Sequence, residues 1–173
     1  MRLGLWWLAA FSCLVLMGCE PSGPTHTGAG VYVIREKDTD EVRARMLESV
    51  NFLRQSAGIA PVTINPLLTE AALRHSEDMS RQQRAWAFGS DGSNPYTRVL
   101  RAGYQGDFVS EMYSETFESE QETVAAWLED RAWGPELLNA EASEIGIAWH
   151  QDESGRLWWT VTFGKAASPI PSL

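Results

Sequence analysis

Apolar residues recur at helical spacing along the first half of the chain. Four of them fall on one stripe, Val42, Met46, Val50 and Leu53. The stripe predicts a helix that begins near Asp38 and ends before Gly58. Glu41 follows Asp38 by three residues, so these two side chains are expected to form a capping box at the start of this helix.

A second helix is predicted to begin at Asn65-Pro66, with the asparagine as N-cap and the proline in the first helical position. The inner stripe of this helix carries Leu68, Ala72, His75 and Met79. Beyond it, Gly, Asp and Pro residues predict a loop over 85–95, and Gly103 closes a short helix over 96–102. The first half of the chain is therefore predicted to be helical.

In the second half of the chain, apolar and polar residues alternate along several stretches. They predict strands over 108–113, 145–149 and 157–163, the last two joined by a turn over 152–155. A further helix begins at Ser119, where Glu122 three residues later completes a second capping box. Helices followed by a strand, a helix and a hairpin predict an α+β domain, layered, with a mainly antiparallel sheet.

The chain begins with a short apolar leader. Met1-Arg2 is followed by an apolar stretch over 5–17, which is typical of a signal peptide and too short to span a membrane comfortably. The leader ends in Leu16-Met17-Gly18-Cys19, which resembles the lipobox of bacterial lipoproteins. The resemblance implies a signal peptide over 1–18 and acylation of Cys19; an ordinary secretory leader is the alternative. Pro, Gly, Ser and Thr residues then predict a flexible tether over 19–37.

Charge and cysteine content narrow the expected partners. The formal net charge is −9, which argues against nucleic acid and against adhesion to anionic headgroups. Contact with a membrane is therefore expected through lipid on Cys19. Cys13 lies in the leader, so no cysteine is left for a disulfide and stability has to come from packing. The compartment implied is the cell envelope, on the extracytoplasmic side, and Glu20 after the cysteine favours the outer membrane.

Several stretches, taken in order, resemble the CAP superfamily, also called the SCP or PR-1-like domain, in its short bacterial form. They are Asn51, Arg54, Gly58-Ile59 and Asn65; residues 72–79; residues 89–93; Pro95, Arg98 and Gly103-Tyr104; Glu111; Trp127; residues 137–139; Ile145-Gly146; and Trp159-Thr160 with Phe163-Gly164. The resemblance implies a three-layer α-β-α sandwich. The domain is expected over 38–166, with a C-terminal tail over 167–173.

The departures from the family pattern concern its cleft. CAP domains usually place two histidines, which can hold a divalent metal, beside acidic residues. The resemblance puts Ala87 at the first histidine position and Trp133 at the second, while Met112 replaces the Asn that follows Glu111. Neither Ala nor Trp offers a lone pair to a metal ion. No metal and no cofactor are therefore expected.

Five residues are candidates for a ligand-binding cleft: Glu111, Met112, Trp133, Ala87 and His75. Glu111 either lines the cleft or lies on the solvent side of a strand. His75 is either a histidine at the core edge held by a hydrogen bond, with Asp78 as one candidate partner, or a cleft residue. Trp133 is expected in a turn between helices, where it either anchors a ligand or fills the space of the absent histidine. Trp158-Trp159 is interpreted as core and sheet surface rather than as a stack that binds a ligand.

The leading hypothesis is a lipid-anchored, extracytoplasmic CAP-like domain that binds without catalysis. Its ligand would be a small apolar molecule, a lipid or an envelope component. One alternative is an envelope hydrolase in which Glu111 acts as general base with His75 nearby, which requires both groups to reach a common atom or water. The other is a structural or protein-interaction module with Trp133 at the partner surface.

Overall fold

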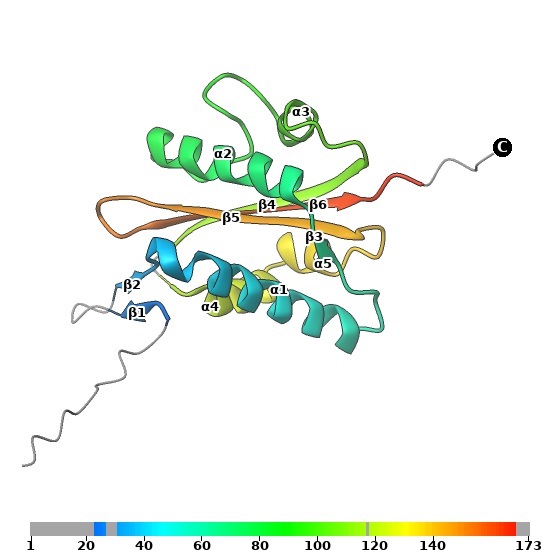
Figure 1. Ribbon diagram of the computed structural model, residues 1–173, viewed down its shortest axis with the longest axis horizontal. Helices are drawn as coiled ribbons and strands as arrows, with labels where there is room; N and C mark the ends of the chain where they lie inside the picture. The colour runs from blue at the N-terminus through cyan, green and yellow to red at the C-terminus, as the bar shows by residue number, and fades with distance from the viewer. Residues whose placement is uncertain (1–22, 27–30, 117, 169–173) are drawn as a thin grey trace, which may run out of the picture.

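The protein is built around a four-stranded sheet with helices on both faces (Figure 1). The computed structural model describes residues 23–26, 31–116 and 118–168. The strands of the sheet are β3 (Thr63–Ile64), β4 (Asp107–Thr116), β5 (Glu144–Gln151) and β6 (Leu157–Lys165). The helices are α1 (Thr39–Ser56), α2 (Pro66–Gln82), α3 (Pro95–Arg101), α4 (Glu120–Glu129) and α5 (Trp133–Leu137). The predicted three-layer α-β-α sandwich is confirmed.

The sheet has the strand order β3-β5-β6-β4 and is antiparallel except at one edge. β5 and β6 form the predicted hairpin, in which Trp149 lies opposite Trp159. β4 pairs antiparallel with β6, with an irregularity between Phe108 and Ser110. The two-residue strand β3, which the hydrophobic pattern did not reveal, pairs parallel with β5. The sheet is therefore mainly antiparallel, as predicted.

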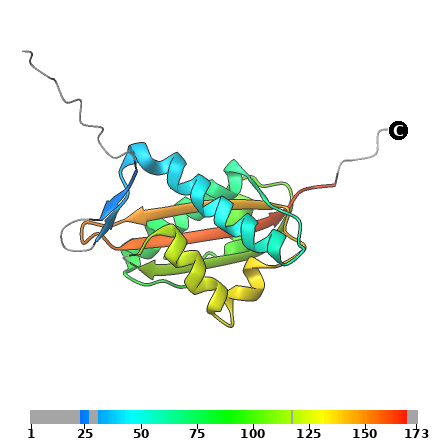
Figure 2. The same ribbon diagram turned by 90° about the horizontal axis from the view of Figure 1, so that it is seen from below.

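The helices divide between the two faces. α2 and α3 lie over one face, whereas α1, α4 and α5 lie under the other, as the view from below makes clear (Figure 2). α2 packs directly on β5, because Gly146 has no side chain to hold the helix away. A Cβ atom at Gly146 would overlap the backbone carbonyl of Leu68. This close approach fixes the depth at which α2 sits on the sheet.

The main hydrophobic core fills the space between the sheet and α1, α4 and α5. Alternate residues of β6 point into it, among them Trp159, Val161 and Phe163, and all are fully buried. Met46 of α1 and Trp127 of α4 close it from the helix side. Trp158 points to the opposite face and is also fully buried, so both tryptophans belong to the core and neither lies at the exposed surface of the sheet. Because residues alternate along each strand, the two faces of β4 and β6 carry different chemistry.

Two of the three predicted helix starts form as expected. The Asn65 side chain accepts hydrogen bonds from the backbone N–H groups of Leu67 and Leu68 at the start of α2. Ser119 and Glu122 form a reciprocal capping box at α4. The capping box predicted for Asp38 and Glu41 is wrong. The Asp38 carboxylate instead pairs with Arg35, whose Nε lies 2.7 Å away, in a short 3-10 helix over Glu36–Asp38 that precedes α1.

The packed structure begins earlier than the predicted boundary at residue 38. β2 (Tyr32–Val33) pairs antiparallel with β1 (Thr25–His26). Tyr32 is 4% exposed and donates a hydrogen bond of 2.6 Å to Glu120, a carboxylate that Arg45 also binds. Backbone groups of Ile34 and Tyr32 bond the Gln151 side chain. Residues 31–37 are thus part of the domain rather than of a free tether.

A buried arginine ties α1 to the loop before β5. Arg54 has no exposed surface, and its guanidinium donates to four backbone carbonyls. These belong to Ala60, Leu137, Asn139 and Ala142, at 2.9 to 3.1 Å. Within the described residues it forms no ion pair with a carboxylate, so the four carbonyl dipoles take the place of a counter-ion. Burial lowers the pKa of Arg54.

Some predictions fall outside the described residues. The signal peptide over 1–18, the lipid on Cys19 and the last five residues of the C-terminal tail are among them. In the described part of the chain, none of the helices combines the length and apolar character needed to cross a bilayer.

Candidate functional site

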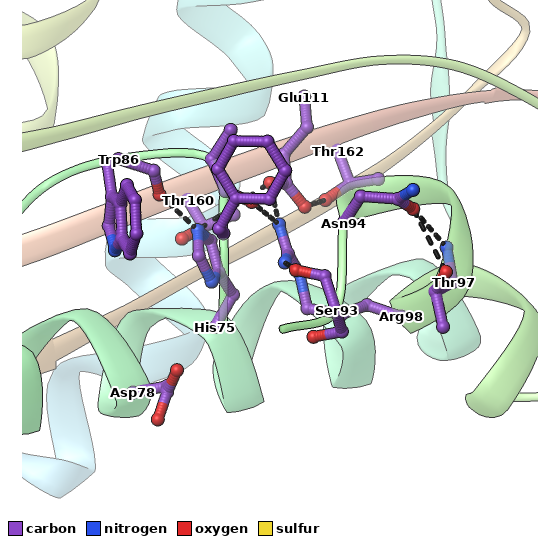
Figure 3. Close-up of polar contacts among 12 residues, drawn as sticks. His75, Asp78, Trp86, Ser93, Asn94, Thr97, Arg98, Glu111, Thr160 and Thr162 are labelled. Carbon is purple, nitrogen blue, oxygen red and sulfur yellow. Dashed lines mark hydrogen bonds and ion pairs between the residues drawn. The ribbon is translucent and has the colours of Figure 1, made fainter. Parts of the chain in front are cut away.

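Glu111 lies in the middle of β4 and points toward α2. Its side chain has no exposed surface. One carboxylate oxygen accepts a hydrogen bond of 2.5 Å from Arg98, and the other accepts one of 3.3 Å from the Thr162 hydroxyl on β6 (Figure 3). Thr162 can reach it because it lies directly opposite Glu111 in the sheet. The carboxylate is therefore enclosed and has a partner on each oxygen.

Arg98 comes from α3, which is oriented by its own start signal. Asn94 caps this helix by accepting from the backbone N–H of Thr97, and Pro95 occupies the first helical position. The Arg98 guanidinium also donates to the carbonyls of Ser93 and Ala87, at 3.1 and 3.0 Å. One buried cation thus joins α3, the loop after α2 and the edge strand β4. The arrangement holds the loop against the sheet.

His75 lies on α2 beside this ion pair and is fully buried. Its Nε2 lies 2.9 Å from the Trp86 carbonyl oxygen. Because a carbonyl can only accept, Nε2 carries the proton and Nδ1 holds the lone pair of the neutral ring. Nε2 is 3.7 Å from Glu111, beyond hydrogen-bond distance. The histidine is held by a hydrogen bond, but its partner is Trp86 rather than Asp78.

Burial shifts the pKa values of Glu111 and His75 in the directions that favour their neutral forms. Burial raises the pKa of Glu111 to about 7, although the Arg98 charge and the hydrogen bonds oppose the shift. Burial, together with the Arg98 charge, lowers the pKa of His75 to about 4. At neutral pH the imidazole is therefore uncharged. Because the imidazole is neutral, the charges in this part of the interior are those of the Arg98–Glu111 pair.

The five predicted cleft residues do not converge on one cavity. Glu111 and His75 lie together, and Ala87 joins them through its carbonyl, which Arg98 binds. Met112 points to the opposite face of the sheet and is fully buried in the main core, because neighbouring residues of a strand alternate. The expectation that Met112 lines a cleft with Glu111 is wrong.

Trp133 is the first residue of α5 rather than part of a turn. Its ring lies edge-on to Tyr113, with ring centroids 5.2 Å apart, and it packs against the main core. Tyr113 in turn contacts His75, with ring centroids 6.1 Å apart. Trp133 is therefore separated from the Glu111 carboxylate by Tyr113 and is partly buried by its neighbours.

The donor set does not fit a divalent metal. Both Glu111 oxygens already accept hydrogen bonds, and the guanidinium of Arg98 supplies the positive charge at this carboxylate. A metal ion there would face the arginine charge directly. Within residues 23–26, 31–116 and 118–168, no group of three or more His, Cys, Asp or Glu side chains is arranged to hold a metal ion. The residues present are those of a buried ion pair.

Sequence reasoning missed three members of this site: Arg98, Thr162 and Trp86. The hydrophobic pattern gives no signal for them, since Arg98 reads as an exposed charge on a short helix and Trp86 contributes only a backbone carbonyl. One signal was available: Arg98, with Pro95 and Gly103, is among the residues that resemble the CAP family, although it was not named as a site residue. Of the acidic residues that follow Glu111, Glu115, Glu118 and Glu122 are exposed, whereas Glu120 at the start of α4 is buried.

Comparisons with known proteins agree with the fold and the order of its motifs. A family model described as the cysteine-rich secretory protein family, CAP, matches residues 47–163. An uncharacterized protein of Bacillus subtilis (strain 168), YkwD, is 24% identical over 121 residues, covering 70% of this chain and 46% of that protein. The chain thus spans less than half the length of this relative.

Two solved structures share the fold. An outer surface protein from Borrelia burgdorferi superimposes with a TM-score of 0.65 at 19% identity, over 75% of this chain and 96% of that one. An extracellular protein containing an SCP domain, from Bacillus anthracis, superimposes with a TM-score of 0.68 at 14% identity, over 77% of this chain and 44% of that one. With the family model covering most of the chain, the protein belongs to the CAP, or cysteine-rich secretory protein, family.

Proposed function

We propose that this protein is a lipid-anchored, extracytoplasmic CAP domain that binds a small apolar or lipid ligand without catalysis. The leader and Cys19 support the anchor. The relatives described as an outer surface protein and an extracellular protein support the compartment. A lipid-modified cysteine also gives an acidic domain a means of membrane attachment that its own charge does not provide.

The observation that carries the non-catalytic role is the enclosure of Glu111. A general base has to reach the proton that it removes, directly or through one water. The Glu111 side chain has no exposed surface, and Arg98 and Thr162 occupy its oxygens. His75 has its proton on Nε2 and directs it to the Trp86 carbonyl. The hydrolase alternative therefore lacks an accessible base at this position.

The apolar groove between α1 and α4 is the ligand site that we propose in place of a cleft at Glu111. It has a volume of about 420 Å³ and is lined by Glu48, Ser49, Phe52, Leu53, Gln121, Val124, Ala125 and Leu128. Phe52 is 69% exposed and Leu128 is 37% exposed, so apolar surface remains open to solvent. Polar groups at its rim suit a ligand with an apolar chain and a polar end.

Binding of a fluorescent fatty acid, cis-parinaric acid, to the full-length protein in detergent tests this site. We expect saturable binding that Phe52→Glu weakens at least tenfold, because covering a phenyl ring is worth about 2 kcal/mol. Leu100→Glu is the matched control, since Leu100 is 52% exposed on α3, across the sheet from the groove. Absence of saturable binding, or equal weakening by both variants, contradicts the groove.

The anchor and the absence of catalysis have separate tests. Mass spectrometry of the mature protein is expected to find acyl chains on Cys19, and Cys19→Ser is expected to release the domain from membranes. An unmodified Cys19 in membrane-free protein would remove the anchor from the proposal. Turnover of a peptide or envelope polymer that Glu111→Gln abolishes would overturn the non-catalytic role.

A further inference from the structure

β4 is an outer strand of the sheet, so one of its two sides has no neighbouring strand (Figure 2). Asn65 donates its backbone N–H to the Ile145 carbonyl, so the odd-numbered residues of β5 turn their backbone groups toward β3 and the even-numbered ones toward β6. Followed through the paired residues of β5, β6 and β4, this alternation turns the backbone groups of Glu111, Tyr113 and Glu115 away from β6. We call this row of N–H and C=O groups the free edge of β4.

The free edge of β4 has open backbone groups. In the described part of the chain, no hydrogen bond joins the outward N–H and C=O groups of Glu111, Tyr113 and Glu115 to another residue. Glu111 is 7% exposed although its side chain has no exposed surface, so the surface that it exposes belongs to its backbone. Glu115 is exposed as well. An unpaired strand edge of this kind is a template on which another extended chain can add as a further strand.

A small acidic pocket lies beside the free edge, between β4 and α4. It has a volume of about 250 Å³ and is lined by Ser114, Glu115, Thr116, Thr123, Ala126, Trp127, Asp130 and Trp133. This lining combines two carboxylates with two indole rings and contains no Lys, Arg or His. The residues of α4 that line it lie on the opposite side of the helix from those that line the apolar groove. The acidic pocket and the apolar groove are therefore separate sites.

Asp130 gives the acidic pocket an accessible negative charge. Its Oδ1 accepts hydrogen bonds from the backbone N–H groups of Ala132 and Trp133, at 2.7 and 3.1 Å. Among the described residues, Oδ2 has no hydrogen-bond partner and the carboxylate forms no ion pair, although the residue is exposed. Asp130 also follows the last turn of α4, where the helix dipole adds partial negative charge. The pocket therefore suits a cation, and its indole walls suit the alkyl stem of a lysine or arginine side chain.

We propose that the free edge of β4 binds an extended segment of a partner protein and that a lysine or arginine side chain of this segment enters the acidic pocket. The residue of the added strand opposite Ser114 points its side chain to the same face as Ser114, which is the face of the pocket. In an antiparallel pairing, its two neighbours exchange hydrogen bonds with the backbone of Tyr113 and Glu115. A second copy of the chain fits poorly, because its formal net charge is −9 and β4 contains no Lys or Arg.

Fluorescence anisotropy tests the proposal with a tetramethylrhodamine-labelled heptapeptide, Thr-Val-Thr-Lys-Thr-Val-Thr, titrated with the full-length protein in detergent. We expect saturable binding that weakens about tenfold when glutamate replaces the lysine, because attraction by the pocket becomes repulsion. Methylation of the backbone nitrogens of the two threonines beside the lysine should also weaken binding about tenfold, because it removes two N–H donors of the ladder and keeps the charge.

Two variants of the protein complete the test. Asp130→Asn keeps the oxygen that accepts from Ala132 and Trp133 but removes the charge, so it should weaken peptide binding about threefold. Asp40→Asn is the matched control, because Asp40 is a fully exposed carboxylate at the start of α1, and it should leave binding within about twofold.

The proposal is overturned if the parent peptide does not bind, if the methylated peptide binds as tightly as the parent, or if Asp40→Asn weakens binding as much as Asp130→Asn. Light scattering of the protein alone addresses the other occupant of the edge. We expect no dimer that the parent peptide dissociates. Such a dimer would assign the free edge of β4 to a second copy of the chain and would also overturn the proposal.

Discussion

The buried His75 should make the stability of the domain depend on pH in a way that one substitution removes. In the unfolded chain the imidazole takes up a proton as the pH falls below its ordinary pKa of 6.5. In the folded state it stays neutral down to about pH 4, because burial and Arg98 oppose its charge. Between these values the unfolded state binds one more proton than the folded state. His75 therefore makes the folded state less stable as the pH falls through this window.

The magnitude follows from the shift. Each pH unit within the window costs about 1.4 kcal/mol, so the loss from pH 7 to pH 4 amounts to about 3 kcal/mol. Glu111 acts in the opposite direction, because its pKa is raised from 4.5 to about 7. Its contribution falls as the pH rises from about 4.5 to 7. In the wild-type protein the two effects largely cancel between pH 4.5 and 6.5.

His75→Gln exposes this cancellation. Glutamine retains an N–H group for the Trp86 carbonyl but does not titrate. Urea unfolding of the wild-type protein and the variant from pH 4.5 to 8 gives the difference between their unfolding free energies. The titration of the groups that both proteins share cancels in this difference. We expect the difference to be constant above pH 7 and to shift in favour of the variant by about 1.4 kcal/mol per unit below pH 6.5. A difference that stays flat to pH 4.5 would refute a buried, neutral His75.

Two further predictions concern packing. Arg54→Leu leaves four buried backbone carbonyls without donors and should reduce the unfolding free energy by about 4 kcal/mol. The lysine of Arg54→Lys reaches fewer of these carbonyls than arginine but more than leucine, so this variant should lose less. Equal losses of the two variants in denaturant unfolding would contradict this account. Gly146→Ala should destabilise by about 3 kcal/mol because the new methyl group meets the Leu68 carbonyl and pushes α2 from the sheet. A thermal midpoint unchanged from wild type would rule out that close approach.

Long elements with a clear period could be predicted from the sequence. The stripe from Val42 to Leu53 and the cap at Asn65 correspond to α1 and α2, and the alternation in 145–149 and 157–163 corresponds to the β5–β6 hairpin. Short elements could not be predicted in this way. β2 and β3 have two residues each, so neither offers a period, and β3 exists only because Ile64 lies beside Ile145 in the folded chain. The Asp38 cap failed because Arg35 competes for the same carboxylate.

The candidate site was predictable only in part. Glu111 could be placed on a strand and His75 on the inner stripe of a helix, and the structure places them 3.7 Å apart. Their state could not be predicted, because it depends on Arg98, which reaches them across the fold. The prediction that Met112 lines the cleft was wrong for a simpler reason. Adjacent residues of a strand point to opposite faces, so Met112 could not share a cavity with Glu111.

With the proposed lipid on Cys19, the pairing of β1 with β2 would limit how the domain could stand on a bilayer. Gly23, the first described residue, lies only four positions after Cys19, so a lipid on Cys19 would leave a span of about 14 Å at most. That is about half the width of a small domain, too little for the domain to turn over freely. β2 lies against the turn between β5 and β6 through Gln151. This turn would therefore face the lipid, and the loop before β5, at the far end of the sheet, would point away from the membrane (Figure 1).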